Sequence, residues 1–264
     1  MGPREGLASA IDETVRRMSS GRRVAVAFSG GLDSGLVACL AGRYAESVTL
    51  YTCGTDGSFD VLAAEELSSR IGLPWVHLRI SEEDIEDLVR GTASAGGDAD
   101  PFTVSYELQL YCVLLRSSED TVLSGQGADE YFMGCAKYVE CADCDFEAYV
   151  RDGIRRLDEV SVPFERSMAR SLGKEVLYPY LDPEVVSVST SIPVWDMRPK
   201  DMDSRKAVLK EAAVELGFPF LAQRTKKSSQ YGSGTTDLIR SMAKKQGMMY
   251  NRYVAHVCGT PRER

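Results

Sequence analysis

The sequence lacks any run of about 18 apolar residues, the length that a membrane-spanning helix requires. Its first residues, MGPREGLASAIDE, also lack the apolar core of a secretory signal peptide. We therefore expect a cytoplasmic protein with no membrane partner. The 264 residues are enough for one large domain or for a core with an appended lobe.

An excess of positive charge is also missing, because the formal net charge is −8. Such a chain has no general electrostatic attraction to nucleic acid, which is therefore a disfavoured partner. Histidine is scarce, and His77 and His256 are too far apart in sequence to suggest a zinc motif. The seven cysteines are an odd number in a chain too large to need disulfides for stability, which favours reduced thiols.

The most informative stretch is VAVAFSGGLDSGLVA at residues 24–38, a buried strand followed by a glycine-rich turn and a helix start. Glycines let backbone N–H groups approach an oxyanion, and a helix N-terminus adds partial positive charge. Ser29 and Ser34 add hydroxyl donors, and Asp33 can hold a magnesium ion. The stretch predicts a nucleotide-phosphate site, although the G-x-x-x-x-G-K-S/T phosphate loop and its lysine are absent.

Strand and helix patterns alternate along the first half of the chain. Strands are expected at residues 24–28, 47–52, 75–80 and 121–123, with helices between them. This alternation predicts an α/β fold with a doubly wound parallel sheet, whose ligands lie beyond the carboxyl ends of the strands. The small-residue segment 91–101 is expected to be a loop near the site.

From about residue 145 the patterning becomes helical, and no further strand is expected. Helical patterns cover residues 145–159, 183–191, 204–216 and 236–246. We therefore divide the chain into an ATP-binding α/β core, residues 1–144, and a helical lobe packed on it, residues 145–264.

A second glycine-rich turn follows the last expected strand, in the segment VLSGQGADEYFMG at residues 122–134. Ser124 and Gly125 can approach a nucleotide, and Asp129 adds a second carboxylate opposite Asp33. Two carboxylates together with phosphate oxygens form an ordinary magnesium shell. We expect both turns to face one site for ATP and Mg²⁺.

These turns and later segments resemble the motifs of a known family. The first turn resembles the SGGxDS loop of the PP-loop ATP pyrophosphatase superfamily, and the second the SGxGxDExFGG segment of asparagine synthetases and β-lactam synthetases. Further segments resemble asparagine synthetase motifs in the same order: residues 165–169 (ERSMA), 175–182 (EVLYPYLD), 205–210 (RKAVLK) and 224–232 (RTKKSSQYG). The chain thus resembles the C-terminal, synthetase domain of the asparagine synthetases over residues 7–240.

The resemblance implies a ligase that adenylates a carboxylate substrate with ATP, releases pyrophosphate and then transfers a nitrogen nucleophile. Lys226 matches the lysine that stabilises the adenylate and pyrophosphate in that family, and Arg224 would be a second cation. The acceptor is expected near Gln126, Glu175 and residues 91–106. The catalytic residues are then Lys226, Asp33, Asp129 and Arg224. The nucleotide-binding residues are Ser29, Gly30, Gly31, Asp33, Ser34, Thr52, Ser124 and Gly125.

The chain departs from the family pattern at three points. No glutaminase domain precedes the first turn, and residue 2 is Gly rather than a nucleophilic cysteine, so we expect free ammonia or a separate glutaminase partner. Gln126 replaces the family glutamate, and glutamine cannot act as a general base or hold an ammonium ion electrostatically. Leu177 replaces an arginine. The acceptor carboxylate and the oligomeric state, a homodimer included, stay open.

Three cysteines raise an alternative function. Cys135, Cys141 and Cys144 follow the second turn and could ligate zinc or, with Cys53 or Cys258, an iron–sulfur cluster. PP-loop enzymes that insert sulfur into tRNA use cysteines near such a site. The alternative is therefore a sulfurtransferase acting on tRNA or a small molecule.

A second alternative is a non-catalytic ATP-binding subunit or sensor. The absence of a carboxylate at Gln126 supports it. Asp33, Asp129 and Lys226 argue against it, because a pure binder does not need groups for magnesium and pyrophosphate.

Overall fold

Five parallel strands form the centre of the structure, a computed structural model that describes residues 6–97, 100–223 and 232–259. Their order across the sheet is β3-β2-β1-β4-β5. The strands are β1 (Arg23–Ala27), β2 (Ser47–Gly54), β3 (Trp75–Arg79), β4 (Thr121–Leu123) and β5 (Glu175–Leu177). The predicted doubly wound parallel sheet is confirmed.

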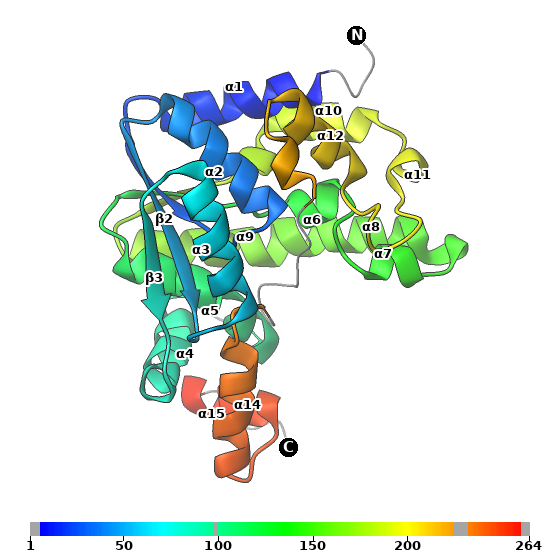
Figure 1. Ribbon diagram of the computed structural model, residues 1–264. Helices are drawn as coiled ribbons and strands as arrows, with labels where there is room; N and C mark the ends of the chain where they lie inside the picture. Colours follow the sequence, from blue (N-terminus) through cyan, green and yellow to red (C-terminus); the bar gives the residue numbers. More distant parts are fainter. Residues whose placement is uncertain (1–5, 98–99, 224–231, 260–264) are drawn as a thin grey trace.

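The central strand β1 is apolar from Val24 to Ala27 because helices cover both faces of the sheet. Val24, Ala25 and Val26 of β1 are fully buried. Helices α2 (Leu32–Tyr44) and α3 (Phe59–Ile71) lie on one face (Figure 1). The other face is covered by α4 (Glu82–Gly96), α5 (Pro101–Arg116) and α9 (Val162–Ser171).

The expected loop at residues 91–101 is mostly helical, so that prediction was wrong. Helix α4 continues to Gly96, and α5 begins at Pro101 behind Asp100, whose carboxylate accepts the backbone N–H groups of Phe102 and Thr103. The small residues of the segment allow close packing. A Cβ on Gly96 would lie 2.1 Å from the ring of Phe164 on α9.

The C-terminal part of the chain supplies a strand that the sequence did not predict. β5 pairs with β4 in parallel, with Glu175 opposite Thr121. Three residues are too few for a periodicity to be visible in the sequence. The division at residues 144 and 145 stays a prediction, and the lobe contributes to the sheet of the core.

The remaining elements surround this sheet. Helix α1 (Leu7–Ser19) packs on α2, α10 and α12. The other helices are α6 (Ala128–Tyr131), α7 (Lys137–Glu140), α8 (Asp143–Arg156), α10 (Pro183–Ser191), α11 (Val194–Met197), α12 (Ala207–Glu215), α14 (Thr235–Lys245) and α15 (Tyr250–Cys258). A π-helical turn η1 (Leu157–Ser161) and two 3₁₀ turns, η2 (Pro179–Leu181) and η3 (Pro219–Leu221), complete them. Among the described helices, none is both long and apolar enough to cross a membrane.

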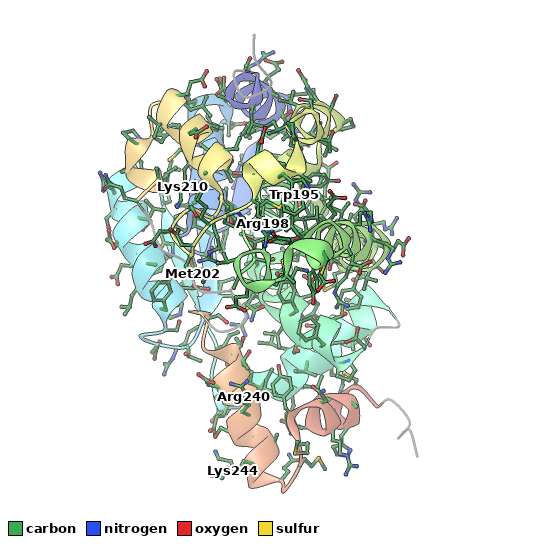
Figure 2. The ribbon with its side chains drawn as sticks, turned by 90° about the vertical axis from the view of Figure 1, so that its right-hand side faces the viewer. Trp195, Arg198, Met202, Lys210, Arg240 and Lys244 are labelled. Atoms are coloured by element: carbon green, nitrogen blue, oxygen red, sulfur yellow. The ribbon has the colours of Figure 1, made fainter. Side chains whose placement is uncertain are left out.

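The segment between α11 and α12 lies on the face turned toward the viewer in Figure 2. Arg198 is next to Trp195 there, with its guanidinium carbon 5.2 Å from the ring centre, and it forms an ion pair with Asp143 of α8. From Arg198 the chain passes Met202 and enters α12, which carries Lys210 (Figure 2). These contacts hold the segment that leads to Lys206 against α8.

Candidate active site

The first glycine-rich turn connects β1 to α2 and is folded against α3. Gly30 has φ +70°, and a Cβ there would lie 2.4 Å from the backbone nitrogen of Ala64, so only glycine fits. The hydroxyl of Ser34 accepts the backbone N–H of Ser29 at 3.2 Å and lies 3.3 Å from the Ser29 hydroxyl. Serine hydroxyls and backbone donors therefore meet at the N-terminus of α2, an arrangement that binds anions.

The second turn lies against the first. It begins directly after β4, at Ser124, whose backbone N–H still donates to the carbonyl of Leu177 in β5 at 3.0 Å. A Cβ on Gly125 would lie only 3.1 Å from Cβ of Asp33. The carboxyl ends of β1 and β4 thus bring the two turns into contact.

Lys206 connects the two turns to the C-terminal lobe. Its Nζ lies 2.6 Å from Oδ2 of Asp33 and 2.6 Å from Oδ1 of Asp129. The lysine is 7% exposed and has φ +57° immediately before α12. One buried ammonium group between two carboxylates reduces the repulsion that they would otherwise exert on each other.

Gly134 leaves the space that this ion pair occupies. A Cβ there would lie 2.1 Å from both Oδ1 of Asp129 and Cε of Lys206. Its N–H donates to the carbonyl of Asp129 at 2.8 Å, and its own carbonyl accepts Arg205 Nη1 at 2.9 Å. The backbone at residue 134 thus holds both charged partners in place.

A cavity of about 140 Å³ lies in front of the two turns. Thr52 at the end of β2 forms part of its wall, since its hydroxyl donates to the carbonyl of Phe28 at 2.6 Å and accepts Trp75 Nε1 at 2.8 Å. Helix α5 contributes Tyr106 and Gln109 to the lining. The cavity therefore joins the anion-binding turns to a more apolar wall, as a nucleotide with its phosphates requires.

Two buried carboxyl groups, Glu107 on α5 and Glu165 on α9, line the same cavity. The side-chain amide of Gln126 donates to Oε1 of Glu165 at 2.8 Å. Burial raises the pKa of Glu165 to about 7. Burial and the neighbouring Glu165 raise the pKa of Glu107 well above its usual range. Groups with such shifted pKa values can carry or accept a proton near neutral pH.

The relationship of the chain follows from a comparison with protein families. The family model for asparagine synthase matches residues 6–149, more than half of the 264 residues, and includes both glycine-rich turns. The chain belongs to the asparagine synthase family.

Individual relatives agree with this assignment. A Methanocaldococcus jannaschii protein described as asparagine synthetase (glutamine-hydrolyzing) 1 is 30% identical over 288 residues, which cover 94% of this chain and 53% of that protein. The asparagine synthetase (glutamine-hydrolyzing) of Sandersonia aurantiaca is 25% identical over 242 residues, covering 84% of this chain and 46% of that protein. The chain thus spans about half the length of these curated relatives. Among solved structures, NMN synthetase from Francisella tularensis has a TM-score of 0.45 at 14% identity and covers 100% of this chain and 89% of that chain.

Most residues predicted from the asparagine synthase motifs meet at the cavity. The following line it: Ser29, Asp33, Ser34, Thr52, Ser124, Gly125, Gln126 and Asp129. Gly30 and Gly31 lie in the first turn between these residues.

Glu175, predicted to bind the substrate, lies elsewhere, and we correct that prediction. It is the first residue of β5, at the amino edge of the sheet, whereas the cavity lies at the carboxyl edge. Its carboxylate is exposed and forms an ion pair with Arg22 at 2.8 Å. In this family segment it is Tyr180 that contacts the site, through a 2.9 Å hydrogen bond to the carbonyl of Asp33.

Two groups of predicted site residues remain without a structural description or support. Arg224 and Lys226 lie outside the described residues. Cys135 and Cys141 are half-buried and Cys144 is exposed. Among the residues that the structure describes, no group of three or more His, Cys, Asp or Glu side chains is placed to hold a metal ion.

Lys206 and Glu107 were absent from the predicted site. Lys206 is the second residue of the segment 205–210 that resembles an asparagine synthetase motif, but we expected it within a helix at residues 204–216. The helix begins at Ala207, after Lys206. For Glu107, the available signal was a single acid in the otherwise uncharged stretch TVSYELQLYCVLL, where burial without a function is unfavourable.

Proposed function

We propose that this protein is an ATP- and Mg²⁺-dependent enzyme that adenylates a carboxylate, releases pyrophosphate and transfers a nitrogen nucleophile to the acyl adenylate. The observation that carries the proposal is the buried Lys206, paired with Asp33 and Asp129 where the two glycine-rich turns meet. A phosphate-binding turn, two carboxylates and a fixed cation are the groups needed to bind and stabilise a leaving pyrophosphate.

The donor set fits a magnesium ion. Carboxylate oxygens from two neighbouring turns, completed by phosphate oxygens and water, are the ligands that Mg²⁺ prefers. In the proposal Asp33 and Asp129 hold Mg²⁺, which neutralises phosphate charge when bound. Lys206 keeps the two carboxylates in position, and the hydroxyls of Ser29 and Ser34 donate to the leaving pyrophosphate.

The adenosine and the acceptor occupy different walls in this proposal. The adenosine lies toward Thr52 at the end of β2, and the acceptor lies toward Gln126 and Glu165. Arg224 and Lys226 are proposed to approach the α-phosphate, as the family resemblance implies. A lysine there stabilises negative charge that develops as the α–β phosphate bond breaks.

Nitrogen transfer is favoured over sulfur transfer by the relatives. The relatives that cover most of this chain are described as asparagine synthetases that hydrolyse glutamine. We propose that ammonia, supplied from solution or by a separate glutaminase, is the nitrogen nucleophile.

A pyrophosphate-release assay tests the proposed function. The purified chain is incubated with ATP, Mg²⁺ and a panel of carboxylates that begins with aspartate, with and without ammonium chloride. We expect AMP and pyrophosphate in equal amounts with at least one acceptor, and loss of both with Asp129→Asn. ADP and inorganic phosphate as products would contradict the proposal.

A further inference from the structure

Unpartnered acceptor atoms gather in the cavity on the side of α5 and α9. Within the described residues, Oε1 of Glu107 and Oε2 of Glu165 are buried with no donor on them, and the two carboxyl groups face each other closely enough to share a proton. The two side chains are 3% and 1% exposed and line the cavity. Gln109 on the same helix adds Oε1 as a third unpartnered acceptor in the lining. A buried acceptor without a donor is costly, so such a set indicates a ligand that donates hydrogen bonds.

The basic side chains near Glu107 and Glu165 do not take the place of such a ligand. Arg156 of α8 and Arg166 of α9 are the basic groups that act on the two carboxyls. Arg156 donates to the hydroxyl of Thr103 and lies over the ring of Phe102. Arg166 lies over the ring of Tyr178, whose hydroxyl faces Glu165. Each guanidinium group therefore already contacts a residue other than the two carboxyls.

We propose that Glu107 and Glu165 bind the nitrogen nucleophile as an ammonium group, ammonium itself or a primary amine, and accept the protons that it loses. An ammonium group has several N–H donors and no acceptor, which complements a set of acceptor oxygens. A magnesium ion fits less well, because it requires near-ideal octahedral coordination. This inference rests on the proposed function for the acyl adenylate, but the binding step does not require it.

Nitrogen transfer moves two protons from the nitrogen and exchanges one C–O bond for one C–N bond. The bound ammonium group gives one proton to Glu165, and the lone pair that remains forms a C–N bond to the acyl carbon. The C–O bond to AMP breaks, and its electron pair stays on the phosphate oxygen of AMP. The second N–H proton passes to Glu107, so the nitrogen ends as a neutral amide. Glu165 thereby takes over the base role that Gln126 cannot perform, while Gln126 holds its carboxyl in place.

Infrared difference spectroscopy of the full chain without ATP tests the binding step. Because burial raises the pKa of Glu165 to about 7, we expect the pair to retain a proton at pH 6 and to give an acid carbonyl band. We expect ammonium chloride to remove that band saturably, with a gain of carboxylate signal, because two ionised carboxylates hold the cation. Between pH 5 and pH 7, the apparent affinity for ammonium should increase by up to about tenfold for each unit by which the pH is raised, since ammonium competes with the proton. Potassium chloride, whose cation donates no hydrogen bond, should leave the band unchanged.

Variants assign the response to the pair. Glu107→Gln and Glu165→Gln should each abolish the ammonium response, and near-ultraviolet circular dichroism checks that both remain folded. Glu130→Gln is the matched control. Glu130 is buried, its pKa is raised to about 7 and it has an unpartnered oxygen, but it does not line the cavity. It should keep the response.

Three results would overturn the inference: an equal effect of potassium, a band that ammonium leaves unchanged, or an ammonium response that survives in Glu165→Gln. A failure of the proposed function has a different signature. The ammonium response would then be intact while no acceptor supports pyrophosphate release.

Discussion

Lys206 determines the charge balance where the two glycine-rich turns meet. The ammonium group of Lys206 and the two carboxylates together carry a net charge of about −1. This remaining negative charge favours a divalent cation, which in turn binds phosphate oxygens. Without Lys206, a nearly buried Asp33 would face Asp129 without the ammonium group that pairs with both. The residue therefore matters for both the fold of the site and its chemistry.

We predict that Lys206→Met lowers kcat for pyrophosphate release by about 10²–10³-fold, because a fixed cation is lost where charge develops. The free energy of unfolding should fall by about 3 kcal/mol, because a buried carboxylate loses its partner. Steady-state kinetics and urea unfolding measure the two effects. Lys210→Met is the matched control from the first turn of α12, because Lys210 donates to the carbonyl of Asp203 and not to a carboxylate of the site. Equal effects of both substitutions would contradict the role of Lys206.

A second residue-scale prediction concerns Glu165 and pH. Burial raises its pKa from 4.5 to about 7 in the folded protein, so the folded state binds this proton more tightly than the unfolded state. The stability from the proton is present below about pH 4.5 and is lost as the pH rises to about 7. Between about pH 4.5 and pH 7, the free energy of unfolding should therefore decline less steeply in Glu165→Gln than in wild type. The two slopes should differ by at most about 1.4 kcal/mol per pH unit. Urea unfolding across this pH range measures it. Exposed Glu46→Gln is the control, and parallel curves for wild type and Glu165→Gln would contradict the prediction.

At the scale of elements, the turn η2 attaches the C-terminal lobe to the start of α2. Tyr180 in η2 is fully buried, packs edge-on against Phe132 with ring centres 5.8 Å apart, and donates to the carbonyl of Asp33. The contact joins the segment that follows β5 to the first glycine-rich turn. It therefore couples the order of the lobe to the position of Asp33.

We predict that Tyr180→Phe lowers the free energy of unfolding by about 1 kcal/mol, because the buried hydrogen bond from the Tyr180 hydroxyl to the carbonyl of Asp33 is lost. The aromatic packing is retained, so the change isolates the hydrogen bond. Tyr149→Phe is the control, since Tyr149 is 43% exposed. Denaturant melts of the three proteins decide the question. An unchanged midpoint for Tyr180→Phe would show that the bond does not hold the elements together.

The elements also show what sequence could predict and why. The first four strands and both turns were predictable, because β1 and β4 run directly into glycine-rich segments and β2 and β3 are bounded by helix and turn signals. The three-residue β5 was not, since its place depends on pairing with β4. The start of α12 was missed because the ion pair of Lys206 outweighs its local helical preference. The pair of Glu107 and Glu165 depends on the packing of α5 against α9, which a single sequence does not specify.

At the scale of the whole molecule, one cavity collects groups from the sheet, from α5 and from the C-terminal lobe. The sheet supplies the turns, α5 supplies Glu107 and the lobe supplies Glu165. The lobe also supplies Lys206, which pairs with Asp33 and Asp129 of the lining. The family relationship covers the half of curated relatives to which this chain corresponds. The proposed use of ATP and the proposed transfer of nitrogen can be tested separately.

Transfer of heavy oxygen from the acceptor to AMP tests the central claim, adenylation of a carboxylate, most directly. The acceptor that supports pyrophosphate release is labelled in both carboxylate oxygens and incubated with ATP, Mg²⁺ and ammonium, and the AMP is analysed by mass spectrometry. We expect one labelled oxygen in each AMP, because a carboxylate oxygen remains on the phosphate when nitrogen displaces it. Unlabelled AMP, or label in inorganic phosphate together with ADP, would contradict the adenylation mechanism.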